Sequence, residues 1–561
     1  MSQEDIRSHK LLYEAVLEVD GKLLHWVEAL AEFLDARFRK RGLKELVFNG
    51  GLSVSGLQHV GRLRGEIIIP DVVAQLLKKR GYTVKQYLTL YTQDAWKGKP
   101  EQQAAFRNPE EARKYVGWPL ARVPDPLGEK SSWVERFWED FGPYISRFTS
   151  GSVEVVTTTE LYRGALREFV KLAITRREEI RRIVNKYRGR NPYPEGWIPF
   201  EARCAGCGRI DSTKATAVNL DRDEVEYTCT ACGYRGKAAI WDGKLNWRVE
   251  WVGVWWALRV SFEPYGKDHA TPGGSRDSAN ELATKVFGFQ PPEGLPYEWV
   301  SLRTGKGESD MTSSGFVGIT PREWLEVAHP EVLRFLYLRV PPMRKVTVSL
   351  EEVPQYYEAY YKAERVYYGV ESTGNKKEDY LLAKSYELSH TGNPPDSMPA
   401  QIPYTHAAIL AQVVPESLWG SEAIRRLQKS GHIASTPSRF DRERVLSLLP
   451  RARRWVEAYG PPQMRIRILS ELPSDIANQI PEEHRTLLRK LGEALEKVEP
   501  WAEESIKQAL LEFTRGWPAA KRREFYRYFY MVFVGSPSGP RAAPLLSLLD
   551  KSFVLERLLS L

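Results

Sequence analysis

The stretch Glu45–Gly61 reads ELVFNGGLSVSGLQHVG, and it decides the fold class of the chain. Residues 45–48 are typical of a short buried strand, and a glycine-rich turn follows them. An apolar-periodic helix is then expected over 67–77, and a second strand over 82–90. A strand, a helix and another strand in this order form a βαβ unit, which predicts a parallel sheet.

The turn after the first strand has the composition of an anion-binding turn. Small residues let the backbone approach a ligand closely; they are Gly50, Gly51, Ser55, Gly56 and Gly61. The helix that follows offers free N–H groups at its N-terminus, and His59 can donate a hydrogen bond to phosphate oxygens. The spacing matches neither a Walker A loop nor GxGxxG. The alternative is a tight turn with a surface histidine.

Composition and pattern predict several packed units. The chain has 561 residues, of which 42% are hydrophobic and 27% charged, as in ordinary globular proteins. We expect an N-terminal helical segment over 1–42 and an α/β domain over 43–350, interrupted by insertions. Aromatic alternation over 245–262 is interpreted as strand. Helical patterns dominate 351–561, which predicts an all-α C-terminal domain.

The net charge favours a polyanionic partner, and the hydropathy does not favour a membrane span. The net charge is +9 and the isoelectric point is near 9.1. No apolar run reaches the roughly 18–20 residues of a membrane span, and the N-terminus lacks the apolar core of a signal peptide. We therefore expect a soluble, cytoplasmic protein with no membrane partner.

A basic cluster over 421–470 holds eleven Lys and Arg against four acids. Arg451, Arg453 and Arg454 are interleaved there with Trp455 and Tyr459. Arginines contact phosphates and aromatic rings stack on unpaired bases, so the cluster is interpreted as an RNA-binding surface. The alternative is a solubilising helix face.

All four cysteines of the chain lie within 29 residues, in a module expected at about 201–240. Two CxxC knuckles each present two thiolates, which predicts one closed, tetrahedral, structural zinc site. Its ligands are Cys204, Cys207, Cys229 and Cys232. The alternative is two pairs of reduced or disulfide-bonded cysteines. Clustering rather than dispersed pairing favours a reducing compartment.

Two further loops carry polar residues. The segment 262–269 reads FEPYGKDH and places Lys, Asp and His after a strand, at the edge where α/β sheets bind ligands. The loop 310–314 reads DMTSS. For both loops the alternative is an ordinary solvated turn.

Together these motifs resemble the class I lysyl-tRNA synthetases, a mainly archaeal family. The family's first signature, Pro-Ser-Gly-x-x-His-hydrophobic-Gly-Asn, matches residues 54–62 with His59, Val60 and Gly61 retained. Collinear similarity covers most of the chain. Its other segments are 115–119, 123–126, 247–249, 262–269, 533–541 and 549–553.

The resemblance implies a Rossmann-type catalytic domain with a zinc-binding insertion, followed by an α-helical anticodon-binding domain. It implies ATP-dependent activation of lysine, with Mg²⁺, and transfer of the lysyl group to tRNA. The implied lysine-binding residues are Gly51, Ser53, Trp247 and His269. The expected ATP-binding residues are Ser55, Gly56, His59, Val60, Gly61, Arg62 and Lys306. The expected signature loop is Asp310, Met311, Thr312, Ser313 and Ser314, which together with His59 and Gly61 makes up the catalytic set.

The sequence departs from the family in the signature loop. Asp310 and either Ser313 or Gly315 stand where the family has lysines. The candidates for a replacement positive charge are Lys306, which lies between two glycines, together with Arg303 and Lys267. The alternative for Lys306 is an ordinary turn lysine. The missing lysines leave two other functions open: a catalytically silent or repurposed synthetase-like protein, and class I activation of another amino acid.

A second departure lies in the insertion after the second strand. The family has a metal cluster there, of which this chain keeps only Asp125. Glu129, Lys130 and Arg136 replace the remaining ligands. One zinc ion is therefore expected in this chain, and not two.

Overall fold

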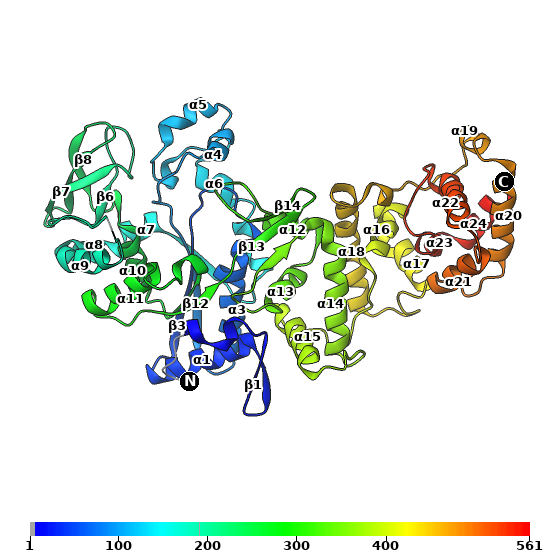
Figure 1. Cartoon of the computed structure of the whole chain (residues 1–561), viewed down its shortest axis with the longest axis horizontal. Coiled ribbons are helices and arrows are strands. Elements are labelled where there is room, and N and C mark those ends of the chain that lie inside the picture. Colours follow the sequence, from blue (N-terminus) through cyan, green and yellow to red (C-terminus); the bar gives the residue numbers. More distant parts are fainter. Residues whose placement is uncertain (1–5, 190) are drawn as a thin grey trace. The chain divides into compact units, whose positions relative to one another are not determined.

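The computed structural model describes residues 6–189 and 191–561. These form two compact units (Figure 1). The first comprises residues up to 323 together with 333–348 and 372–393, and the second comprises 324–332, 349–371 and 394–561. Among the described residues, no helix combines the length and apolar character that crossing a membrane requires.

A five-stranded, fully parallel sheet organises the first unit, as the βαβ pattern predicted. Its spatial order is β12-β11-β3-β4-β5. The strands are β3 (Glu45–Leu52), β4 (Thr83–Leu90), β5 (Val153–Thr157), β11 (Phe262–Gly266) and β12 (Glu293–Tyr297). The chain builds outward from β3 in one direction and later returns to its other side with β11. The junction of β3 and β11 is thus the switch point, where doubly wound sheets bind ligands.

Helices cover both sides of this sheet. In Figure 1, α10 and α11 lie to the left of the strands and α3 lies to their right. A Cβ at Gly50 would collide with the backbone oxygen of Glu66, so glycine lets the first strand lie directly against the first helical turns. The helices of this unit around the sheet are α1 (Trp26–Lys40), α2 (Val60–Leu63), a π-helical turn (Arg64–Ile68), α3 (Ile69–Lys78), α7 (Thr158–Arg163), α8 (Leu166–Thr175), α9 (Arg177–Lys186), α10 (Trp247–Leu258) and α11 (Ser275–Glu281).

The prediction of helix throughout residues 1–42 is wrong for residues 16–25. A hairpin of β1 (Val16–Val19) and β2 (Lys22–His25) precedes α1. Asp20 and Gly21 form its turn with φ values of 50° and 75°. An Asp-Gly pair tolerates two positive φ angles, which is what a tight hairpin turn requires.

The interpretation of 245–262 as strand is also wrong, because most of it forms α10. Trp247, Trp251 and Trp255 recur every four residues, the helical repeat, and the first two rings stack at 5.4 Å between centroids. The helix ends at Arg259, which adopts a left-handed conformation, and β11 begins three residues later.

Three small sheets, β10-β6, β7-β8-β9 and β14-β13-β15, complete the first unit. The cysteine module contains β6 (Phe200–Ala202), β7 (Thr213–Asn219), β8 (Glu224–Cys229), β9 (Arg235–Ala239) and β10 (Gly243–Leu245). The signature loop follows a hairpin in the sheet formed by β13 (Val300–Thr304), β14 (Gly307–Asp310) and β15 (Val346–Val348). The insertion after β4 carries α4 (Pro100–Ala104), α5 (Pro109–Ala112) and α6 (Trp133–Trp138).

The described residues of the second unit form helices and no strand, as the all-α prediction expected. They include α14 (Val353–Tyr367), α16 (Tyr404–Val413), α17 (Ile424–Lys429), α18 (Arg439–Ala458), α19 (Ser474–Asn478), α20 (Glu482–Glu496), α21 (Glu503–Phe513), α22 (Ala519–Val534), α23 (Ala542–Ser547) and α24 (Lys551–Leu559). Helix α15 (Lys376–Ser389) belongs instead to the first unit, where Ser385 lies 3.1 Å from His25 Nε2. Two helices, α12 (Pro321–Val327) and α13 (Pro330–Leu338), include residues of both units.

Candidate active site

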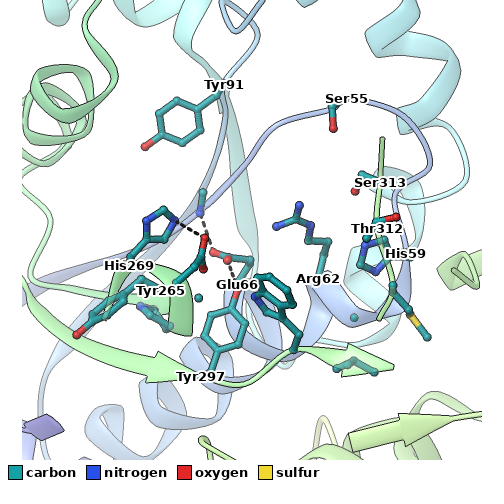
Figure 2. A pocket seen from close by; sticks show the side chains of 18 of the residues that line it. Ser55, His59, Arg62, Glu66, Tyr91, Tyr265, His269, Tyr297, Thr312 and Ser313 are labelled. Carbon is teal, nitrogen blue, oxygen red and sulfur yellow. Dashed lines mark hydrogen bonds and ion pairs between the residues drawn. The ribbon is translucent and has the colours of Figure 1, made fainter. Parts of the chain in front are cut away.

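A pocket of about 350 Å³ opens at the carboxyl ends of β3, β11 and β12. It lies at the switch point of the sheet (Figure 2). Figure 2 shows His269 and Tyr91 on one side, His59 and Thr312 on the other, and Arg62 with Glu66 between them. Of the residues expected from the sequence, the pocket brings together Gly51, Ser55, His59, Gly61, Arg62, Trp247, His269, Met311, Thr312, Ser313 and Ser314.

His59 lines one end of the pocket and is 5% exposed. Neither ring nitrogen has a hydrogen-bond partner within 6–189 or 191–561. Burial, with the nearby charge of Arg62, lowers the pKa of His59 to about 3. The ring is therefore neutral at physiological pH and carries one N–H that can donate to a ligand.

Arg62 projects into the middle of the pocket (Figure 2). Its Nε atom is buried, and its side chain has no hydrogen-bond or ion-pair partner among the residues described. A guanidinium group cannot lose its charge at physiological pH, so this group is available to an anionic ligand. It stands where the family's first signature carries asparagine.

Glu66 faces the pocket one helical turn after Arg62 and is 4% exposed. Its carboxylate accepts hydrogen bonds from the Gly51 N–H at 2.8 Å and from the Tyr297 hydroxyl. Burial raises the pKa of Glu66 to about 7. Glu66 is not among the residues expected from the sequence; its signal there is an acid four residues after Arg62, on one face of a helix that begins at the pocket.

The other end of the pocket is aromatic and carries a second carboxylate. Glu263 accepts hydrogen bonds from the indoles of Trp251 and Trp255 at 2.9 and 2.7 Å and from Asn49 at 3.2 Å. The Trp247 ring lies 5.7 Å from that of His269, between centroids. Aromatic walls beside carboxylates suit a ligand with an alkyl chain and an ammonium group. Pro264, Tyr265, Gly266 and Asp268 of the segment 262–269 also line the pocket, at the sheet edge where that segment is expected to bind a ligand. The remaining lining residues, which the sequence did not indicate, are Tyr91, Tyr297, Trp299 and Val300.

The signature loop turns its middle residues toward the pocket and its acid away. Asp310 accepts from Ser301 Oγ at 2.7 Å and pairs with Lys345 at 2.9 Å, so it lies outside the pocket lining. Thr312 and Ser313 line the pocket, and Lys99 of the insertion donates to Ser314 at 2.9 Å. Asp310, expected in the catalytic set, therefore lies outside the pocket lining, because Lys345 and Ser301 engage its carboxylate.

Four further expected residues also lie outside the lining. Ser53 and Val60 are not among the lining residues, and Gly56 packs against the loop, where a Cβ would collide with the Ser313 carbonyl. Lys306 occupies the exposed turn between β13 and β14, so it does not supply the pocket with charge. The other two candidates for the replacement charge pair with acids: Arg303 with Glu308, and Lys267 with Glu298 at 2.7 Å.

The cysteine knuckles converge as the zinc prediction requires. Cys204 and Cys232 have their sulfur atoms 3.6 Å apart, and Cys207 and Cys229 have theirs 3.7 Å apart. Sulfur atoms of a tetrahedral zinc site, each about 2.3 Å from the ion, lie about 3.8 Å from one another. All four sulfurs lie within 4.8 Å of one another, so the cluster is compatible with zinc and not with two disulfides.

Asp125, the residue that the chain keeps from the family's second metal cluster, pairs with Arg136, which replaces another ligand in the sequence. Asp125 accepts two hydrogen bonds from the Arg136 guanidinium, both at 2.9 Å, and two from the backbone N–H groups of Glu129 and Lys130. Hydrogen bonding to Arg136 and to these amides holds the pKa of Asp125 well below its usual range, against the effect of burial. The Arg136 guanidinium thus supplies the positive charge beside the Asp125 carboxylate.

The three arginines of the basic cluster lie on α18 and differ in what they contact. Arg451 is half-buried and donates to the Ser447 carbonyl. Arg453 pairs with Glu457 and Arg454 with Glu326, both at 3.1 Å. The latter two side chains are 42% and 52% exposed, so they can exchange these partners for phosphates.

A doubly wound sheet with an anion-binding turn after its first strand and a pocket at its switch point has the form of a class I aminoacyl-tRNA synthetase catalytic domain. Residues 24–392 match the family described as class I tRNA synthetases (K), and the chain belongs to that family. It is therefore an aminoacyl-tRNA synthetase.

Curated relatives extend over nearly the whole chain. A lysine–tRNA ligase of Aeropyrum pernix is 57% identical over 95% of this chain and 97% of its own length. A lysine–tRNA ligase of Pyrococcus horikoshii is 33% identical over 96% and 99%. A solved glutamate tRNA ligase of Elizabethkingia meningosepticum is 11% identical, with a TM-score of 0.36 over 91% of this chain and 98% of that one.

Proposed function

We propose that the chain is a lysine–tRNA ligase, which activates lysine with ATP and transfers the lysyl group to tRNA. The observation that carries this proposal is the division of the pocket. Glu66, Glu263 and the tryptophans suit the ammonium groups and alkyl chain of lysine, whereas Arg62 and His59 suit the phosphates of ATP. The names of the two archaeal relatives support the same substrate.

Activation joins the lysine carboxylate to the α-phosphorus of ATP and expels pyrophosphate with the electrons of the broken P–O bond. Negative charge then moves onto the leaving pyrophosphate. Arg62 and the neutral His59 N–H are placed to stabilise this charge, together with the hydroxyls of Thr312 and Ser313. Mg²⁺ accompanies the triphosphate, as in other synthetases. A ribose hydroxyl of tRNA next attacks the lysyl carbonyl, and AMP leaves.

Aminoacylation tests the proposal directly. Purified full-length chain, ATP–Mg²⁺, radiolabelled lysine and archaeal tRNA should yield acid-precipitable counts that ribonuclease removes. Omission of ATP should abolish these counts. Transfer of a different amino acid, with no transfer of lysine, would contradict the proposal. We also propose that the protein works in the cytoplasm, the location expected from its sequence.

We propose that the cysteine cluster holds one zinc ion, which ties β6 to the turn between β8 and β9. Replacement of Cys207 by serine is expected to lower the zinc content by one ion per chain, because four thiolates are needed to close the site. Atomic emission on the purified protein measures this content. Ser212→Ala is the control, because the Ser212 hydroxyl lies 3.5 Å from the Cys229 sulfur and is not a ligand. Equal zinc in the parent and in Cys207→Ser would refute the site.

Ionisation of Glu66 should govern lysine affinity. The pKa of Glu66 is raised to about 7, so the carboxylate charge that attracts an ammonium group is present above that pH and is lost below it. The KM for lysine should therefore fall as pH rises from 6 to 8. In Glu66→Gln, KM should be roughly tenfold or more higher at pH 8, the cost of one charge-assisted hydrogen bond. A Glu66→Gln enzyme with the parent's pH dependence would show that another group titrates.

Arg453 and Arg454 are proposed to contact the phosphates of tRNA. Replacing both with glutamine should weaken tRNA binding and reduce the slope of log affinity against log salt by roughly 2, about 1 per phosphate contact. Lysine activation without tRNA should be unchanged. Glu457→Gln is the matched control: it frees Arg453 and should raise the affinity for tRNA. If the salt slope is the same in all three proteins, this helix face is only solvated.

A further inference from the structure

Two histidines and a glutamate from three separate segments meet inside the second unit. His406 lies in α16, His432 follows α17, and Glu503 is the first residue of α21. The Glu503 carboxylate lies 3.4 Å from His406 Nδ1 and 3.5 Å from His432 Nε2. The two imidazole rings stack at 3.9 Å between centroids, and the three candidate ligand atoms lie within 4.8 Å of one another.

These separations fit a shared ion better than direct hydrogen bonds. A hydrogen bond from nitrogen to oxygen spans about 2.7–3.2 Å, which is shorter than either distance here. Ligand atoms that each lie about 2.0–2.1 Å from a tetrahedral zinc ion are about 3.4 Å apart. Each ring nitrogen thus lies from the Glu503 oxygen at the spacing of neighbouring corners of a zinc tetrahedron, and all three atoms lie within 4.8 Å of one another.

His406 supplies an independent reason for a ligand. Its side chain is 2% exposed, and across 6–189 and 191–561 no hydrogen-bond partner meets either ring nitrogen. Buried polar atoms without a partner are rare in folded proteins. Nδ1 faces the Glu503 carboxylate, so a cation between these two atoms would satisfy both.

The neighbouring contacts orient the second histidine. The Ser430 hydroxyl lies 2.9 Å from His432 Nδ1, which leaves Nε2 directed at Glu503. Metal-binding histidines commonly use their second ring nitrogen in this way, and the contact fixes the orientation of the ring. The Glu503 side chain is 33% exposed, so water can reach the remaining position of the tetrahedron.

We propose that His406, His432 and Glu503 bind a zinc ion, with a water molecule as the fourth ligand. Two imidazoles and one carboxylate form a ligand set typical of zinc. The ion would join the start of α21 to α16 and to the turn after α17. The site lies in a different unit from the four cysteines and shares no ligand with them.

Zinc stoichiometry of the full-length chain tests this site. Each protein is incubated with excess zinc chloride, desalted and analysed for metal by mass spectrometry. The parent should hold two ions per chain and Glu503→Gln should hold one, since the amide keeps the shape of the side chain but loses its charge. Glu504→Gln is the control and should hold two, because Glu504 is exposed and contacts Lys507 and Gln508.

The zinc-dependent melting temperature provides a second measurement that does not rely on retention during desalting. Brief chelation of the zinc-loaded parent should lower its melting temperature, and zinc added back should restore it. His432→Gln should abolish this response if Glu503→Gln fails to fold. One zinc ion in both the parent and Glu503→Gln, with no difference in the chelator response, would show a simple ion pair and overturn the proposal.

Discussion

Replacement of Arg62 by alanine is expected to lower the rate of lysine-dependent ATP–pyrophosphate exchange by about 10²–10³-fold, the loss typical of one transition-state donor. Arg62 is the pocket-facing cation without a protein partner in the described parts of the chain. The loop that carries lysines in the family offers hydroxyls here, so under the proposed function we expect this side chain to stabilise the pyrophosphate. The maximal rate should fall more than the affinity for ATP.

Lys306→Ala is the matched control for Arg62→Ala. Lys306 lies on an exposed turn, outside the pocket lining, and its removal should leave exchange unchanged. Arg62→Lys should recover part of the rate, because it restores charge without the planar fork of arginine. Full activity in Arg62→Ala, or a loss in Lys306→Ala of the same size, would contradict the assignment of charge to Arg62.

His59→Ala is expected to reduce the activation rate by a similar 10²–10³-fold, because it removes one N–H donor from the phosphate end. The lowered pKa of His59, about 3, adds a second expectation. Its ring does not titrate between pH 5 and 8, so neither limb of the pH–rate profile in that range arises from His59. Single-turnover formation of the adenylate, followed across this pH range, measures both effects. A mutant with full rate and only a raised KM would exclude a role in charge stabilisation.

The sequence predicted the features that depend on local spacing. The strand, glycine turn and helix around His59 formed as expected, and the two CxxC knuckles converged. Both are short-range patterns whose geometry is set within a few residues. Local patterns also carried the signals for two features that were predicted wrongly. Asp20-Gly21 is a hairpin signal, and Trp247, Trp251 and Trp255 repeat every four residues, as in a helix.

The partners of the pocket residues could not be predicted, because they come from distant segments. Asp310 is neutralised by Lys345, and Ser314 is contacted by Lys99, 215 residues away in the chain. Spacing in the sequence does not indicate such pairs. Lys306 is close to the loop in sequence, yet it lies at the exposed tip of a hairpin and outside the pocket lining, whereas Arg62 is farther in sequence and lines the pocket.

ATP–pyrophosphate exchange with each of the twenty amino acids tests the central claim most directly. The division of the pocket into a carboxylate end and a cationic end predicts exchange with lysine and with no other amino acid at comparable efficiency. Exchange with a different amino acid would mean that Glu66 and Glu263 do not select lysine. No exchange with any amino acid would contradict the account altogether and indicate a catalytically silent synthetase-like protein.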